Sequence, residues 1–91
     1  MAKIQINAVP YVVTAGDTNN NDLIIPKAFP AVGLVVKLTV VSGTFKFNNI
    51  GNASESNASY AADESVLLTV IDGFNISYQA NSGADTFRIE I

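Results

Sequence analysis

Residues 34–41 read Leu-Val-Val-Lys-Leu-Thr-Val-Val, and this stretch decides the fold class. Successive side chains of an extended strand point to opposite faces, so the even-numbered positions, all Leu or Val, share one face. The other face carries Val35, Lys37, Thr39 and Val41, and half of it is apolar too. The pattern predicts a central β-strand with one fully buried face and one unusually apolar outer face.

Similar alternation follows on both sides of short turn signals. Thr44–Asn48 places two Phe residues inward around Lys46, and Phe74–Gln79 alternates in the same way. We expect Ser42–Gly43 and Asp72–Gly73 to close two hairpins, because Gly tolerates the positive φ angles of tight turns. In these hairpins Phe74, Ile76 and Tyr78 would face the core.

The rest of the chain also predicts short strands and loops. Pro10 places the strand of residues 9–14 near a sheet edge, because proline cannot donate a ladder hydrogen bond. Residues 16–22 and the Asn- and Ser-rich residues 48–59 predict surface loops, and Pro26–Gly33 an irregular segment. Further strands are expected at residues 3–7 and 23–25, and residues 87–91 alternate as a final strand.

These observations predict an all-β fold with no helix longer than two turns. Six to eight short strands at roughly ten-residue spacing are typical of a small antiparallel β-sandwich or jelly roll, with a small barrel as the alternative. A chain of 91 residues fits one domain, spanning residues 1–91.

Composition excludes several classes of partner. Charged residues make up 14% of the chain and the net charge is −3, so no basic patch is available for nucleic acid or anionic lipid. No apolar stretch approaches the roughly 20 residues of a membrane helix, and the first residues lack the apolar core of a secretory signal. We therefore expect a protein that binds neither nucleic acid nor membrane.

The residue types also argue against catalysis and cofactors. The sequence contains no His and no Cys, which removes the common nucleophilic triads and the preferred zinc ligands. Asp63 and Glu64 form the nearest carboxylate pair, but neighbouring strand residues point apart, so a small hydrolase is the weakest alternative. The loop Asp17–Asp22 begins like a calcium loop, yet Asp22 stands where that motif needs Gly; a looser calcium site or self-bonded turns remain as readings.

A sugar- or receptor-binding loop is the alternative function that the residues allow. Asn52, Asn57 and Tyr60 lie in or beside the loop of residues 48–59, and a Tyr ring can stack on a sugar. A Tyr at a strand edge is also found packed into the core with its hydroxyl at the surface. The Asn-X-Ser sequences at Asn52, Asn57 and Asn75 have no secretory signal before them to make them glycosylation sites.

A protein-interaction surface is predicted from strands that are apolar on both faces. The candidate residues are Val35, Val41, Leu67 and Ile71, each alternating with residues expected in the core. A two-layer sandwich needs only one apolar face per strand, so the second set indicates an oligomer or lattice contact. Cover from the segment Pro26–Gly33 is the alternative explanation.

Several stretches resemble small virion proteins of tailed bacteriophages, of the capsid decoration, head-fibre or tail-associated type. The similarity covers about half the chain, from Gly43 onward. Its similar stretches are Thr44-Phe45-Lys46-Phe47, Ser59-Tyr60-Ala61-Ala62-Asp63-Glu64-Ser65-Val66, Phe74-Asn75-Ile76-Ser77-Tyr78-Gln79-Ala80 and Asp85-Thr86-Phe87-Arg88-Ile89. The resemblance implies a β-sandwich or jelly roll that acts without catalysis or cofactor, often as a homo-oligomer such as a trimer. It also implies virion partners such as the major capsid protein, with assembly in the host cytoplasm.

Overall fold

A computed structural model describes residues 3–5, 10–24, 33–71 and 75–91. The described elements are strands β1 (Lys3–Gln5), β2 (Tyr11–Thr14), β3 (Asn21–Ile24), β4 (Val35–Ser42) and β5 (Thr44–Asn48), the 3₁₀ turn η1 (Ala53–Glu55), and strands β6 (Tyr60–Ala61), β7 (Ser65–Thr69), β8 (Asn75–Ala80) and β9 (Thr86–Glu90). The three-residue η1 is the longest helical segment among these described residues, in agreement with the expected absence of long helices.

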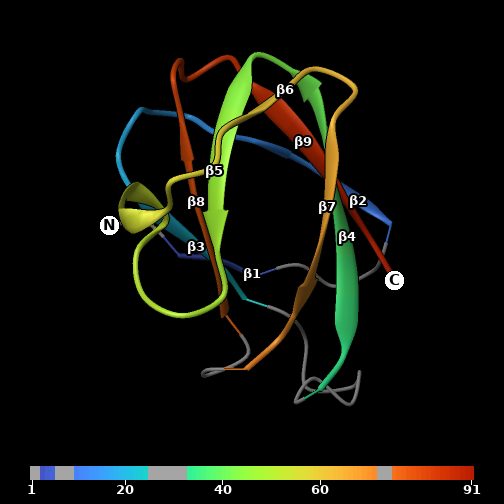
Figure 1. Ribbon diagram of the computed structural model, residues 1–91. Helices are drawn as coiled ribbons and strands as arrows, with labels where there is room; N and C mark the ends of the chain where they lie inside the picture. The colour runs from blue at the N-terminus through green and yellow to red at the C-terminus, as the bar shows by residue number, and fades with distance from the viewer. Residues whose placement is uncertain (1–2, 6–9, 25–32, 72–74) are drawn as a thin grey trace.

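The strands form the two layers of a β-sandwich (Figure 1). Sheet A has the order β1-β3-β8-β5-β6, and sheet B has the order β2-β9-β4-β7. Described neighbours pair in antiparallel fashion, except that β1 runs parallel to β3. The predicted sandwich is therefore confirmed, with β4 inside its sheet and β2, which follows Pro10, at an edge. The three-residue β1 and the two-residue β6 bring the described strands to nine.

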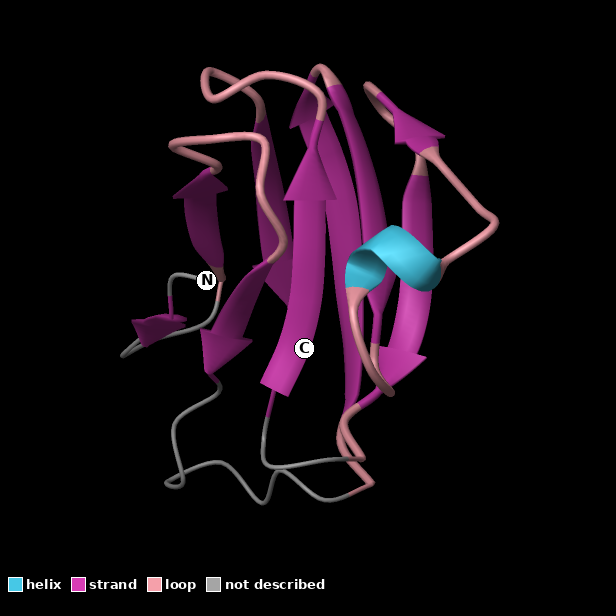
Figure 2. Cartoon of the chain, turned by 90° about the vertical axis from the view of Figure 1, so that its left-hand side faces the viewer, coloured by secondary structure: helices cyan, strands magenta, loops and turns pink. Residues whose placement is uncertain are grey.

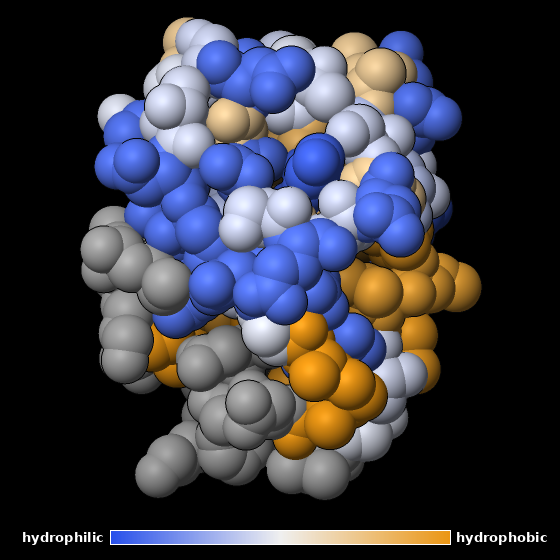
Figure 3. Space-filling model, turned by 60° about the vertical axis from the view of Figure 1, so that its left-hand side comes forward, coloured by the Kyte–Doolittle hydropathy of each residue, from blue (hydrophilic) through white to orange (hydrophobic). Residues whose placement is uncertain are grey.

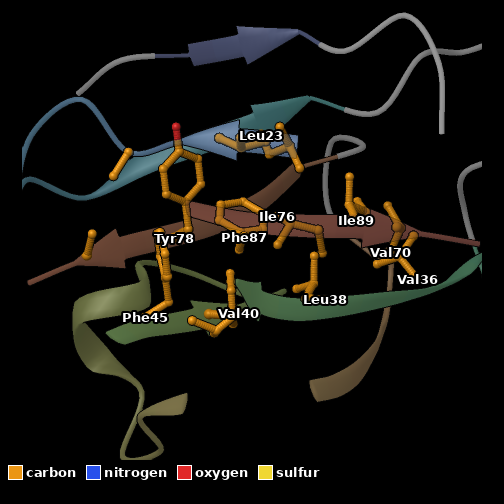
Figure 4. Packing of buried hydrophobic residues seen from close by; sticks show 14 residues of the cluster. Leu23, Val36, Leu38, Val40, Phe45, Val70, Ile76, Tyr78, Phe87 and Ile89 are labelled. Atoms are coloured by element: carbon orange, nitrogen blue, oxygen red, sulfur yellow. The ribbon is translucent and has the colours of Figure 1, made fainter. Parts of the chain in front are cut away.

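One hydrophobic core fills the space between the sheets (Figure 4). The expected alternation holds on β4, where Val36, Leu38 and Val40 are fully buried. At the centre Phe87 of β9 packs against Phe45 and Phe47 of β5, with ring centroids 4.9 and 5.0 Å apart. The other large core side chains come from both sheets and are Val13, Leu23, Val70, Ile76, Tyr78 and Ile89.

Both predicted hairpins are wrong, because the two strands expected to pair in each of them belong to different sheets. β4 lies in sheet B and β5 in sheet A, and β7 and β8 are divided in the same way. At the first crossing Gly43 has a φ of +79°, and its missing side chain leaves room for the carboxylate of Asp85. That buried carboxylate accepts the backbone N–H groups of Ser82 and Thr44, at 3.0 and 3.4 Å.

The long loop of residues 48–59 is confirmed between β5 and β6. Within it η1 lies across the outer face of sheet A (Figure 2). The Asn20 Oδ1 atom holds it there by accepting the Ala53 N–H at 2.6 Å. The Asp72–Gly73 turn, the inward placement of Phe74 and the segment 26–32 lie outside the described residues.

Candidate protein-interaction surface

The four residues predicted for an interface are all exposed on sheet B. The exposed fractions are 47% for Val35, 46% for Val41, 66% for Leu67 and 48% for Ile71. Each belongs to β4 or to the chain of β7 and its continuation, and each alternates with an inward-facing neighbour, as expected for strands apolar on both faces.

Three of the four residues come together. In the ladder between β4 and β7, Val35 lies opposite Thr69 and Lys37 opposite Leu67. Thr69 separates Leu67 from Ile71 along the chain, so Val35 is the diagonal neighbour of both. We call Val35, Leu67 and Ile71 the outer apolar patch.

Val41 lies apart from this patch at the other end of β4. Six residues separate it from Val35, a distance of about 20 Å along a strand. The register between β4 and β9 shifts between Val40 and Ser42, which makes Val41 the extra residue of a β-bulge. Nothing in the alternation of the sequence marks this bulge.

Few charges surround the outer apolar patch. Lys37 projects from the same face of β4, and Glu90 of β9 lies opposite it in the ladder. The Nε atom of Arg88 forms an ion pair with Glu90 Oε1 at 2.9 Å, and both side chains are partly exposed. Such an exposed pair contributes little to stability, at most about 1 kcal/mol.

The alternative ligand-loop residues do not form one platform. Tyr60 is partly buried and its ring packs on Phe47, with centroids 6.1 Å apart, which is the core placement that the sequence also allowed. Asn52 and Asn57 are exposed on the loop, and Asn52 Oδ1 accepts a hydrogen bond from Asn20 Nδ2 at 3.3 Å. The nearby pocket of about 380 Å³ is lined instead by Thr18, Lys46, Gln79, Asn81 and their neighbours.

The calcium-like loop is occupied by its own hydrogen bonds. One oxygen of Asp17 accepts both the Asn19 N–H, at 2.9 Å, and the Asn21 Nδ2 group, at 3.0 Å. The side-chain bond from Asn21, followed by the backbone bond from Asn19, lowers the pKa of Asp17 below 3.8. Within the described ranges, no three Asp or Glu side chains gather closely enough to hold a metal ion.

The carboxylate pair sits in a turn rather than on a strand. Asp63 has a φ of +71°, and Glu64 Oε1 accepts the Ala61 N–H at 2.7 Å. This hydrogen bond closes the turn that leads into β7. The pair therefore lies in the lead-in to β7, where it has a local structural role.

Tyr78 faces the core, as the alternation predicted, and brings its hydroxyl inside the sandwich. Its hydroxyl is buried without a hydrogen-bond partner among the described residues, and it points away from Phe45 (Figure 4). Burial, and then the charges of Asp17 and Asp22, raise the pKa of Tyr78 to about 12. The side chain stays neutral at physiological pH and contributes to the core.

No family model, curated protein or solved structure matches this chain. Among the described residues, no helix has the length and apolar character needed to cross a membrane. Functional inference therefore depends on the surfaces of the chain itself.

Proposed function

We propose that this chain is a non-enzymatic structural subunit of a tailed-phage particle, of the capsid decoration or head-fibre type. It attaches to neighbouring virion proteins, such as the major capsid protein, through the outer apolar patch. The observation that carries this proposal is the exposure of Val35, Leu67 and Ile71 on a sandwich that already has a closed core.

The outer apolar patch has the character of a contact surface. The three branched aliphatic side chains come from β4, from β7 and from the residue two positions after β7. Each square ångström of apolar surface that a partner removes from water contributes about 25 cal/mol. Charged residues are depleted at the centres of protein interfaces. A chain with 14% charged residues and neither His nor Cys suits adhesion better than acid-base or nucleophilic chemistry.

The assignment to a virion is supported by the resemblance of four stretches to small phage structural proteins. One of these stretches includes Phe45 and Phe47 of the core, and another includes Phe87, so the similar residues build the sandwich itself. All three residues of the outer apolar patch lie outside these stretches. In this proposal, the outer apolar patch is the surface specific to the particle that this chain binds, and the similar stretches supply the shared sandwich.

The double variant Val35→Thr with Ile71→Thr tests the attachment. Both side chains are about half exposed, so we expect the melting temperature to change by only a few degrees. Loss of two apolar contacts should weaken attachment to the phage particle at least about tenfold, equivalent to 1.4 kcal/mol. Quantitative mass spectrometry of purified particles measures the bound fraction.

The control is Val12→Thr, which changes a 55% exposed Val on β2, the opposite edge strand of the same sheet. This variant should attach like the wild type. Particles that lack the wild-type chain, or a double variant that attaches as well as the control, would overturn the proposal.

A carbohydrate- or receptor-binding module is the second candidate, and the open polar pocket beside β5 and β8 favours it. Lys46, Gln79 and Asn81 offer donors and acceptors of the kind that hold sugar hydroxyls. Binding to a glycan array that Gln79→Ala abolishes would support this function over particle attachment.

A further inference from the structure

β7 is the least protected of the four sheet edges. The other edge strands are β1 with three residues including Lys3, β6 with two residues, and β2 with four residues after Pro10. Short length, Lys and Pro are the common devices that keep edges from pairing with other chains. β7 has five residues, and residues 65–71 read Ser-Val-Leu-Leu-Thr-Val-Ile without charge, Pro or Gly.

The direction of the backbone groups on β7 follows from the hydrogen bonds at its two ends. Val70 donates its N–H to Leu34 at 2.8 Å, and the Glu64 carbonyl accepts from Val40 at 3.0 Å. Even-numbered residues therefore face β4, and odd-numbered ones direct their N–H and C=O groups to the free edge. The carbonyl of Thr69 points the same way and already accepts the Asn49 Nδ2 group at 2.8 Å, so a partner strand would replace this bond at one end of the edge.

No other described strand pairs with this free edge (Figure 1). Figure 3 looks from the side of sheet A, and hydrophobic residues gather on its right-hand part, toward the front of Figure 1 where β7 lies. At Ser65 and Leu67 the edge thus combines backbone groups that no described strand pairs with and the exposed apolar side chain of Leu67.

Two copies of β7 can pair with each other as antiparallel strands, with Leu67 of one copy opposite Leu67 of the other. In that register Ser65 lies opposite Thr69 of the second copy, and Val66 lies opposite Leu68. The hydroxyl pair repeats one already present in the sheet, where Thr39 and Ser65 are hydrogen bonded at 2.9 Å. The backbones at 65, 67 and 69 all form hydrogen-bonded pairs once the Thr69 carbonyl exchanges the Asn49 side chain for the second copy. No two like charges face each other.

We propose that two copies of this chain pair through β7 about a two-fold axis at Leu67. The two four-stranded sheets B then become one continuous sheet. The half-buried Val66 and Leu68 of each copy become covered by those of the other. A two-fold edge pairing closes on itself, so it gives a dimer where the resemblance implied a trimer.

The dimer would also join the two outer apolar patches, because Leu67 of each copy meets at the axis. This consequence rests on the proposed function, whereas the pairing rests on the edge alone. A chain that dimerises but is absent from particles would defeat the proposed function only. A monomeric chain found in particles would defeat the pairing only.

Cysteine cross-linking tests the register, because the natural sequence contains no Cys. In Leu67→Cys the two Cα atoms should lie about 5.5 Å apart, within disulfide reach. In Ser65→Cys, on the same strand and also exposed, they should be separated by more than about 13 Å. Mild oxidation should therefore cross-link Leu67→Cys at least about tenfold more than Ser65→Cys.

Light scattering tests the association itself. The wild type should approach twice the chain mass of 9.6 kDa as concentration rises. Leu67→Lys should stay monomeric over the same range, because it places two like charges at the axis. Val41→Lys, on the same face but away from the edge, should dimerise like the wild type.

Three results would overturn the pairing. These are a wild type that stays monomeric at millimolar concentration, equal cross-linking of the two Cys variants, and a Leu67→Lys variant that dimerises as the wild type does. Circular dichroism of each variant confirms that the strands are retained.

Discussion

The outer faces of the two sheets differ in both chemistry and cover. On sheet A most outward residues of the paired strands are polar, with Asp22 opposite Ser77 and Lys46 opposite Gln79. The turn η1 lies against β5 and β8 of this sheet (Figure 2). On sheet B the outward residues include the outer apolar patch, and no described segment lies over it. The chain's own loop lies against the outer face of sheet A, whereas no described segment lies over the outer apolar patch of sheet B.

Hydrogen bonds fix the cover on sheet A. Beneath the loop, the buried Ser77 donates its hydroxyl to Asp22 of the neighbouring strand at 2.8 Å. Asn20 anchors the loop itself by accepting the backbone N–H of Ala53. On sheet B, several outward positions are occupied by aliphatic residues instead. The two sheets therefore differ in the residues that they expose. The exposed aliphatic side chains of the outer apolar patch lie on sheet B, where no described loop covers them.

The two outer faces exist only while the sheets are packed face to face. Among the variants considered, Gly43→Ala should destabilise this packing most. A side chain at Gly43 would collide with the Asp85 carboxylate and would also sit at a φ of +79°. We expect a loss of about 2–4 kcal/mol in the free energy of unfolding, measured by chemical denaturation.

Gly16→Ala is the matched control for that variant. Gly16 has a φ of +81° with open space around it, so only the backbone strain of about 1 kcal/mol applies. Equal losses at the two positions would show that the contact with Asp85 is unimportant.

Removing the cover of sheet A should have an intermediate effect. Asn20→Ala takes away the acceptor of the Ala53 N–H, and Ala53 is fully buried. We expect a loss of about 1–2 kcal/mol, together with faster proteolysis within residues 48–59. Asn57→Ala, on the exposed part of the same loop, should change neither quantity; matching behaviour of the two variants would contradict the anchoring role.

The smallest expected effect concerns the pH dependence of the turn beside this cover. Because hydrogen bonds lower the pKa of Asp17 below 3.8, the folded state binds its proton less readily than the unfolded state. Its contribution is present above that pH and is lost as pH falls through the lowered value. The stability difference between wild type and Asp17→Asn should thus be constant from about pH 5 to 7 and shrink below about pH 4. A difference that stays constant down to pH 2 would contradict this.

Alternation predicted the faces of the strands well, because burial of one face imposes a period of two on any half-buried strand. It correctly separated Val36 and Leu38 from Val35, and Leu67 from the half-buried Leu68. It also identified three residues of the outer apolar patch before any register was available.

Partner strands were not predictable in the same way. A Gly with positive φ serves a hairpin turn and a crossing between sheets equally well, so Ser42–Gly43 does not reveal which sheet the next strand joins. The deciding contact comes from Asp85, 42 residues beyond Gly43, and local sequence carries no sign of it. The separation of Val41 from the patch has a similar origin, because the bulge depends on how β9 pairs with β4.

The position of β9 has a consequence for how the chain folds. It is the last strand in chain order, yet it lies between β2 and β4 and pairs Tyr11 with Ile89. Sheet B therefore cannot close until β9 has been inserted between β2 and β4, which both precede it in the chain. Such non-local pairing is slow, on the order of milliseconds to seconds. During that interval residues 65–71 lack their completed sheet, so folding yield should be more sensitive to protein concentration than the stability of the finished sandwich.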